Sequence, residues 1–208
     1  MIKKHWTPRY ILDRAILKLN EVKQPNSPWW TKEAVQIMDR ILKRTDNVLE
    51  FGSGRSTIWL ANRCNQITAV EHDKLWAEKV RNLAEGQGVS INMIVPEIRS
   101  DIWNEYEKES TLYVEHLSIK EKKFDVIIVD GLFRGSCAKS ALELLSANGV
   151  ILVDNVNWYL PSDSRSPTSV ASLSPPKNAD WQYFVEQTKL WRSVLTTNGV
   201  TDTALYFK

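Results

Sequence analysis

The chain has 208 residues, of which 43% are hydrophobic and 25% are charged. This is ordinary globular usage, with enough apolar side chains for a substantial core and too little length for a second full domain. The formal net charge of +2 comes from interspersed acids and bases, so nothing in the composition favours a nucleic-acid or anionic-membrane partner. No segment is as apolar and long as a membrane span, and we expect a cytoplasmic protein with Cys64 and Cys137 as free, buried thiols.

Two amphipathic helices are predicted ahead of the first strand. Apolar residues recur at helical spacing over residues 11–19 and again over 34–42. A proline-containing breaker separates them, and Thr31 is placed to cap the second helix. Trp29 and Trp30, just before that cap, either line the mouth of a substrate site or pack the N-terminal helix onto the core.

An acid and two glycines follow the first apolar strand. The run from Val48 to Thr57 joins a hydrophobic strand to a helix through Gly52 and Gly54, with Glu50 just upstream. Glycines at such a turn take backbone angles that a Cβ forbids and let a ligand approach the main chain closely. Because a glycine pair also closes many ordinary turns, this segment alone leaves a cofactor-binding turn and a simple turn both open.

A second apolar run, residues 67–70, ends in Glu71, where nucleotide-binding α/β folds place an acid that hydrogen-bonds the ribose hydroxyls. A dinucleotide fold would carry a third glycine at position 57, but Thr57 stands there. Glu50 beside the turn would also repel a pyrophosphate, whereas an acid suits a cofactor that carries an amino group and a sulfonium cation. These features favour S-adenosylmethionine over NAD.

The remaining core elements alternate between helix and strand. We expect helices over 58–64 and 73–85, a third strand over 90–95, helix plus loop over 99–123, a fourth strand over 124–131, a crossover helix over 137–147 and a fifth strand over 148–155. The fourth and fifth strands are continuous apolar runs, as expected when helices cover both faces of a parallel sheet. In such a doubly wound α/β sheet, ligands lie beyond the carboxyl ends of the strands. Glu50, Glu71, Asp130 and Asp154 all fall at such ends.

The C-terminal part of the sequence begins with a change in composition and ends with a predicted helix and hairpin. Residues 161–178 are rich in serine and proline, and this segment is either a lid over the site or a solvated insertion. A helix is then predicted over 181–191. Short strands over 193–197 and 203–207 flank an Asn-Gly turn and predict an antiparallel hairpin.

Taken in order, these motifs resemble the class I S-adenosylmethionine-dependent methyltransferases, from about position 34 to the C-terminus. The resemblance implies one domain, residues 1–208, with a doubly wound, mostly parallel, seven-stranded Rossmann-like sheet and a C-terminal antiparallel hairpin. N-terminal helices would occupy residues 1–45 and the cofactor-binding core 46–155. The loop or lid would occupy 156–180, and the last helix and hairpin 181–208.

The resemblance also implies a set of cofactor contacts: Glu50, Gly52, Ser53, Gly54, Ser56, Thr57, Glu71, His72 and Asp130. Main-chain and hydroxyl groups of residues 53–57 would bind the methionine carboxylate, which helix N-termini favour. His72 would border the adenine ring or act as a general base. Asp101 is a weak match for an adenine contact, and a solvated loop acid is the competing interpretation.

Asp130, Asp154 and Asn155 look like the metal site of the catechol and caffeoyl-coenzyme A O-methyltransferases, in which Mg²⁺ orients two substrate oxygens. Those enzymes carry a lysine base three residues after the first metal aspartate, whereas here Phe133 stands there, followed by Arg134. An arginine stays protonated and cannot act as a base. Either these residues hold Mg²⁺, or Asp130 contacts cofactor or substrate directly while the Asp-Asn pair caps its strand.

Asp130, Asp154 and Arg134 are therefore the candidate catalytic residues, with Arg134 either binding an acidic substrate or forming an ion pair. We expect methyl transfer to a small-molecule acceptor, O-methylation being one form of it. The alternative is a catalytically silent protein of the same fold that binds a nucleoside or a partner protein. An NAD-dependent oxidoreductase would need the missing glycine. The sequence leaves the oligomeric state open.

Overall fold

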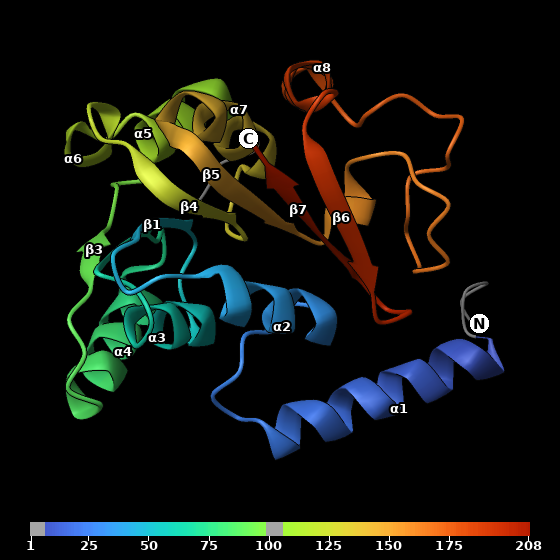
Figure 1. The fold of residues 1–208 in the computed structure, drawn as a ribbon, viewed down its shortest axis with the longest axis horizontal. Helices are drawn as coiled ribbons and strands as arrows, with labels where there is room; N and C mark the ends of the chain where they lie inside the picture. The colour runs from blue at the N-terminus through green and yellow to red at the C-terminus, as the bar shows by residue number, and fades with distance from the viewer. Residues whose placement is uncertain (1–6, 99–105) are drawn as a thin grey trace.

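The computed structural model describes residues 7–98 and 106–208, with only the backbone described for 106–109. Its centre is a seven-stranded sheet in the order β3-β2-β1-β4-β5-β7-β6 (Figure 1). The parallel strands are β1 (Asn47–Phe51), β2 (Gln66–Val70), β3 (Asn92–Ile94), β4 (Phe124–Val129) and β5 (Leu145–Asp154). The hairpin strands β6 (Arg192–Thr197) and β7 (Asp202–Phe207) pair antiparallel, and β7 also runs antiparallel to β5. The predicted doubly wound sheet with its C-terminal hairpin is confirmed.

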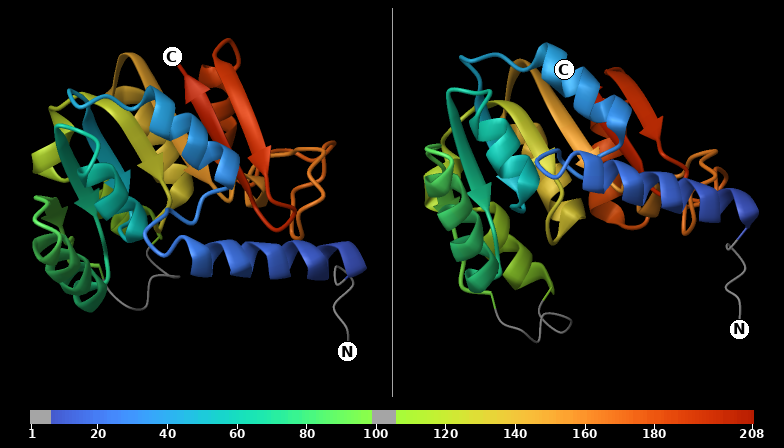
Figure 2. Two further views of the ribbon diagram at one scale, coloured as in Figure 1. Left: turned by 60° about the horizontal axis from the view of Figure 1, so that its bottom comes forward. Right: turned by 90° about the horizontal axis from the view of Figure 1, so that it is seen from below.

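Helices cover both faces of the sheet (Figure 2). Side chains of α2 (Lys32–Ile41) and α3 (Arg55–Ala61) pack on one face with Val48 and Ile128, and α4 (Lys74–Gly86) lies beside α3. The opposite face packs Leu49 and Ile127 against α5 (Tyr106–Val114), α6 (Leu117–Lys120), α7 (Arg134–Leu144) and α8 (Ala179–Thr188). Because neighbouring strand residues point to opposite faces, burial on both sides requires the continuous apolar runs seen in the sequence.

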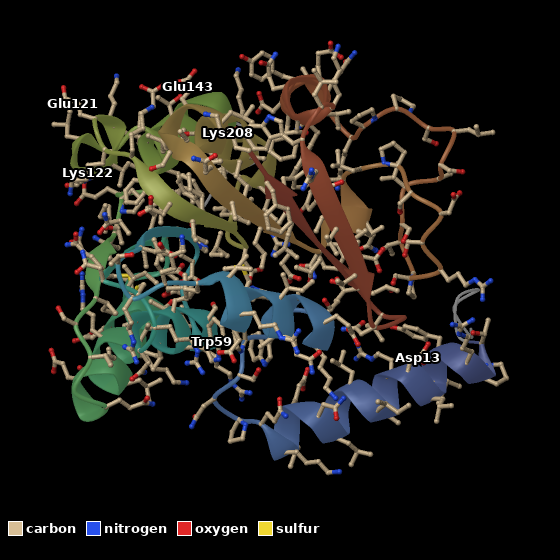
Figure 3. All side chains as sticks on the ribbon, in the orientation of Figure 1. Asp13, Trp59, Glu121, Lys122, Glu143 and Lys208 are labelled. Carbon is tan, nitrogen blue, oxygen red and sulfur yellow. The ribbon has the colours of Figure 1, made fainter. Side chains whose placement is uncertain are left out.

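Helix α1 (Pro8–Lys23) lies along the rim of the molecule and contributes no buried residue (Figures 1 and 2). Apolar side chains on it, such as Leu12 (59% exposed) and Leu19 (59% exposed), remain largely in solvent. Asp13, labelled in Figure 3, lies so close to Gly199 in the hairpin turn that a Cβ on that glycine would clash with its carboxylate. The predicted helix is therefore present, but its apolar stripe is not part of the core.

The two adjacent tryptophans have different environments. Trp30 is 3% exposed and packs edge-on against Trp59, with ring centroids 6.1 Å apart, whereas Trp29 is 57% exposed. Thr31 caps α2, as predicted, by accepting from the Ala34 N–H. Its own N–H donates to the Thr203 hydroxyl (3.1 Å), so this turn is joined to the hairpin.

Several predicted boundaries shift. Helix α3 ends at Ala61, so Cys64 lies beyond it, although both cysteines are buried and free as expected. The crossover helix α7 ends at Leu144 instead of 147, because Leu145 pairs with Phe124 and already belongs to β5. After β5 comes a short 3-10 helix, η2 (Val156–Trp158).

The Ser/Pro-rich segment has no regular element within 161–178 apart from an isolated bridge between Ser162 and Ala171. The Val170 N–H nevertheless donates to the Asn157 carbonyl (2.8 Å), which ties this segment to η2. Within 7–98 and 106–208, no helix combines the length and apolarity that crossing a bilayer requires.

Candidate functional site

The glycine turn after β1 is built on one unusual backbone conformation. Gly52 has φ of +112°, and its N–H donates to the Val70 carbonyl at the end of β2 (2.8 Å). A Cβ at this position would lie 3.0 Å from the Cα of Gly131. Gly54 has φ of 166°, which is extended backbone open to any residue. The expected need for a glycine is thus confirmed at Gly52 and wrong for the backbone at Gly54.

Glu50 stabilises this turn through hydrogen bonds with the residues that follow it. Its side chain is buried, and the hydroxyls of Ser56 and Thr57 donate to its two carboxylate oxygens, the second at 2.6 Å. The Thr57 hydroxyl in turn accepts from the Gly54 N–H (2.8 Å). Burial raises the pKa of Glu50 to about 8 despite these hydrogen bonds. The side chains of Ser56 and Thr57 therefore face the buried acid, and they hold the turn in place.

Glu71 lies at the end of β2 beside the same turn. Its carboxylate accepts from the Ser53 hydroxyl (3.0 Å) and the Asp73 N–H (3.0 Å), and His72 Nδ1 lies 2.9 Å from it. Burial alone would raise the pKa of Glu71, but the hydrogen bonds from His72, Asp73 and Ser53 outweigh it and lower the pKa. The hydrogen bond to Glu71 raises the pKa of His72 against the opposing effect of burial. An ionised carboxylate thus stands next to the glycine turn.

Arg134, the first residue of α7, lies between the carboxyl ends of β4 and β5. Its Nε donates to the Gly131 carbonyl (3.1 Å). Nη1 donates to the Asp154 carbonyl (2.6 Å) and to Asn155 Oδ1 (2.7 Å). Nη2 donates to the carbonyl (2.9 Å) and the carboxylate (2.8 Å) of Asp130. A guanidinium has five N–H groups, and these five hydrogen bonds use all of them within the protein. Arg134 thus forms an ion pair with Asp130, which is one of the two roles predicted for it.

The two aspartates beside this arginine differ in surroundings. Burial raises the pKa of Asp130, and the guanidinium of Arg134 opposes the rise. Burial also raises the pKa of Asp154 to about 7, helped by the negative charge of Asp130. Asp154 is turned toward the hairpin, where its Oδ1 accepts from the Thr203 hydroxyl (2.7 Å). The buried indole N–H of Trp30 is near enough to lower the pKa of Asp130, but it makes no hydrogen bond of ordinary geometry.

The predicted metal ligands are arranged in a way that does not fit a divalent cation. Asn155 Oδ1 already accepts from Arg134, and its amide group donates to the Thr201 hydroxyl (2.6 Å). The Asp154 carboxylate faces Thr203, while Asp130 pairs with the guanidinium. In the described part of the chain, no group of three or more His, Cys, Asp or Glu side chains could hold a metal ion.

A hollow of about 210 Å³ opens between α1 and the tryptophan turn. Trp29 and Trp30 line it together with Arg55, whose guanidinium lies 5.2 Å from the centre of the Trp29 ring. Trp30 therefore belongs both to this hollow and to the surroundings of Asp130. Both tryptophans line the hollow, and Trp30 is also buried in the core while Trp29 is largely exposed.

The sequence interpretation missed two residues that hold the strand ends together. Tyr113 lies in the segment predicted as helix plus loop, and its hydroxyl donates to the Val70 carbonyl (2.7 Å), the group that also accepts from Gly52. Gly131 ends the predicted fourth strand, and it packs against the glycine turn, where a Cβ on it would lie 2.7 Å from the Gly52 nitrogen. A signal existed in the second case, since a glycine after a strand-end acid repeats the pattern at Gly52.

Asp101 lies outside the described residues.

Comparison with known proteins finds similarity in structure alone: no protein-family model and no curated protein sequence matches the chain. A Staphylococcus aureus protein provisionally assigned as a caffeoyl-CoA O-methyltransferase superposes with a TM-score of 0.60 at 14% identity, covering 99% of this chain and 94% of that one. A methyltransferase-like protein from Silicibacter pomeroyi gives 0.57 at 18% identity, covering 86% of each chain.

A third solved structure, the 16S rRNA N2 G1207 methyltransferase of T. thermophilus in complex with AdoMet and guanosine, gives a TM-score of 0.56 at 15% identity. It covers 85% of this chain but only 41% of that protein. The names of the first and third proteins give different substrates, caffeoyl-CoA and 16S rRNA, and the name of the second gives none, so the three share an architecture and no one acceptor. Together with the strand order and the C-terminal hairpin, they establish that this chain has the Rossmann-like fold of the class I methyltransferases.

Proposed function

We propose that the protein is an S-adenosylmethionine-dependent methyltransferase that acts on a small-molecule acceptor. The observation that carries the proposal is the pairing of Glu71 with Ser53: an ionised carboxylate at the end of β2 is joined to the glycine turn after β1. In an open α/β sheet this edge is where ligands bind. The fold shared with methyltransferases adds support.

The residues present fit such a cofactor. The Ser53 hydroxyl and the Asp73 N–H already donate to Glu71, so its oxygens are oriented to accept from donors of the kind a ribose presents. Gly54, on the same turn, is only partly buried, and a Cβ there would find only the Trp76 ring, 4.0 Å away. His72, whose side chain is 39% exposed, stands beside Glu71 and could border the base. The bound cofactor would supply a methyl group already activated by a sulfonium.

The protein then has to place an acceptor and exclude water, since methyl transfer gains mainly from alignment. We place the acceptor between Asp130 and the hollow lined by Trp29 and Trp30. A hollow of about 210 Å³ suits a small molecule, being slightly below the range of about 300 to 1,000 Å³ typical of drug-sized sites. The low formal net charge of +2 does not favour a nucleic-acid substrate.

The direct test is calorimetric titration of the full chain with S-adenosylhomocysteine, followed by methyl transfer from labelled cofactor to a panel of small hydroxyl and amine acceptors. We expect saturable binding and turnover of at least one acceptor class. If millimolar S-adenosylhomocysteine gives no heat and causes no shift in the melting temperature, the proposal is wrong. Binding without turnover across the whole panel would instead support the catalytically silent alternative.

A further inference from the structure

We infer that the guanidinium of Arg134 takes the place of a divalent cation at the ends of β4 and β5, so that this chain carries a built-in, metal-independent cation there. The resemblance to the catechol and caffeoyl-coenzyme A O-methyltransferases implies Mg²⁺ at this position, and the residues present do not fit it. The inference concerns the unliganded fold and does not depend on the proposed function.

The hydrogen-bonding capacity of the Arg134 guanidinium is fully used. Arg134 donates all five of its N–H groups to oxygens of Gly131, Asp130, Asp154 and Asn155, at distances from 2.6 to 3.1 Å. Its side chain is only 12% exposed. Five hydrogen bonds in a fixed planar geometry make this an immobilised group with no donor left for a substrate.

The acceptors around Arg134 are oxygens of the kind that bind divalent cations. Carbonyl, carboxylate and amide oxygens are the ligands that Mg²⁺ and Ca²⁺ take in proteins, and here five such contacts converge on one positive group. Two of the side-chain oxygens, from Asp130 and Asn155, belong to the predicted metal ligands. A divalent cation could use them only by displacing the guanidinium, because two positive groups would repel each other strongly at such a distance.

The local backbone brings Arg134 into this position. Phe133 has φ of 50°, in the left-handed region that is uncommon for a bulky residue, and α7 begins directly after it. Asn155, with φ of 50°, turns the chain at the end of β5 and aims its side-chain oxygen at the same arginine. Both strained turns therefore face the guanidinium, as expected if it binds the two strand ends together.

The consequence for ligand selection follows from geometry. A metal site holds an acceptor through two of its oxygens, whereas a saturated guanidinium offers no coordination position. This consequence, unlike the placement of the guanidinium, rests on the proposed function: a methyl acceptor of this protein would need no adjacent pair of hydroxyls, and a lone hydroxyl or amine would suffice.

The test measures thermal unfolding and Mn²⁺ binding in the full chain, without cofactor. For the natural sequence we expect the same melting temperature with excess Mg²⁺, excess Mn²⁺ or EDTA, and no bound Mn²⁺ by electron paramagnetic resonance. Arg134→Ala should melt roughly 6 to 20 °C lower, because it leaves buried acceptors unpaired. That variant should also bind Mn²⁺, since its oxygens then face an empty position.

Arg192→Ala is the matched control, because Arg192 is an exposed arginine on β6 and its loss changes the net charge equally. It should melt within about 2 °C of the natural sequence. If Arg134→Ala is insoluble, Arg134→Lys, which keeps the charge but offers only three donors, should still lower the melting temperature. Mn²⁺ bound to the natural sequence would overturn the inference, as would an Arg134 variant that melts unchanged or an Arg134→Ala protein that binds no Mn²⁺.

Discussion

Gly52 and Gly131 lie against each other at the point where the turn after β1 meets the end of β4. A Cβ added to Gly131 would be 2.7 Å from the Gly52 nitrogen and 2.8 Å from the Phe51 carbonyl oxygen. It would also lie 2.5 Å from the Tyr113 hydroxyl oxygen, but the other two atoms belong to backbone, which cannot move aside as a flexible side chain can. The two strand ends reach this separation only because neither residue carries a side chain.

Gly131→Ala is therefore expected to destabilise the fold. We predict a loss of about 3 kcal/mol in the free energy of unfolding, at the upper end of the range for overpacking, because main-chain atoms of β1 would have to shift. Urea denaturation followed by circular dichroism measures it. Gly86→Ala, in α4 with no atom within 4 Å of the added Cβ, is the control and should be neutral or slightly stabilising. Equal stability of the two variants would show that the strand ends are less tightly packed than described.

The tryptophan pair offers a second comparison. Trp30→Ala removes a ring that is 3% exposed and packed on Trp59, so we expect a loss of about 3 to 5 kcal/mol. Trp29→Ala removes a ring that is 57% exposed and should cost under about 1 kcal/mol. Both values come from chemical denaturation. If the two substitutions lower the free energy of unfolding equally, Trp30 is not packed in the core as described.

The buried Glu50 makes stability depend on pH. Its pKa is raised from 4.5 to about 8, so between these values the unfolded chain loses the proton while the folded chain keeps it. The folded state then binds more protons, and the free energy of unfolding falls as pH rises from 4.5 to about 8 and levels off above that. Asp154, raised from 3.8 to about 7, acts in the same direction.

Glu50→Gln tests this linkage, because the amide is neutral at every pH. We expect its free energy of unfolding to fall less than that of the natural sequence between about pH 5 and 8, by an amount on the order of a few kcal/mol. Urea denaturation at several pH values measures the difference. The exposed Glu121→Gln should keep the natural pH profile. Parallel profiles for Glu50→Gln and the natural sequence would mean that Glu50 is ionised in the folded state.

Glu71 is the residue on which the proposed cofactor site depends most. Glu71→Ala should weaken S-adenosylhomocysteine binding by about 1 to 3 kcal/mol, because a charge-assisted hydrogen bond to the ribose is lost. Calorimetric titration measures the change in affinity. Glu97→Ala, which removes a 93% exposed acid after β3, is the control and should bind normally. An unchanged affinity in Glu71→Ala, with the fold intact, would move this residue out of the site.

Much of this architecture was determined by the sequence itself. Local side-chain patterns determine three of its features. Continuous apolar runs form β4 and β5, and the hydroxyl of Thr31 and the carboxylate of Asp73 cap their helices. The Asn-Gly pair suits the turn of the hairpin. The positions of acids at strand ends were readable for the same reason, since parallel strands bring their carboxyl ends to one edge.

What the acids do was decided only by the tertiary structure. Glu50 and Asp154 were predicted as acids at strand ends, whereas burial in the fold raises the pKa of each, and hydroxyl groups donate to both. The sequence placed Arg134 near the site without showing that all five of its donors would be used. The ionisation of a side chain and the number of its hydrogen bonds depend on which groups the fold brings within about 3 Å and on how much water it removes. Local sequence determines neither the neighbouring groups nor the loss of water.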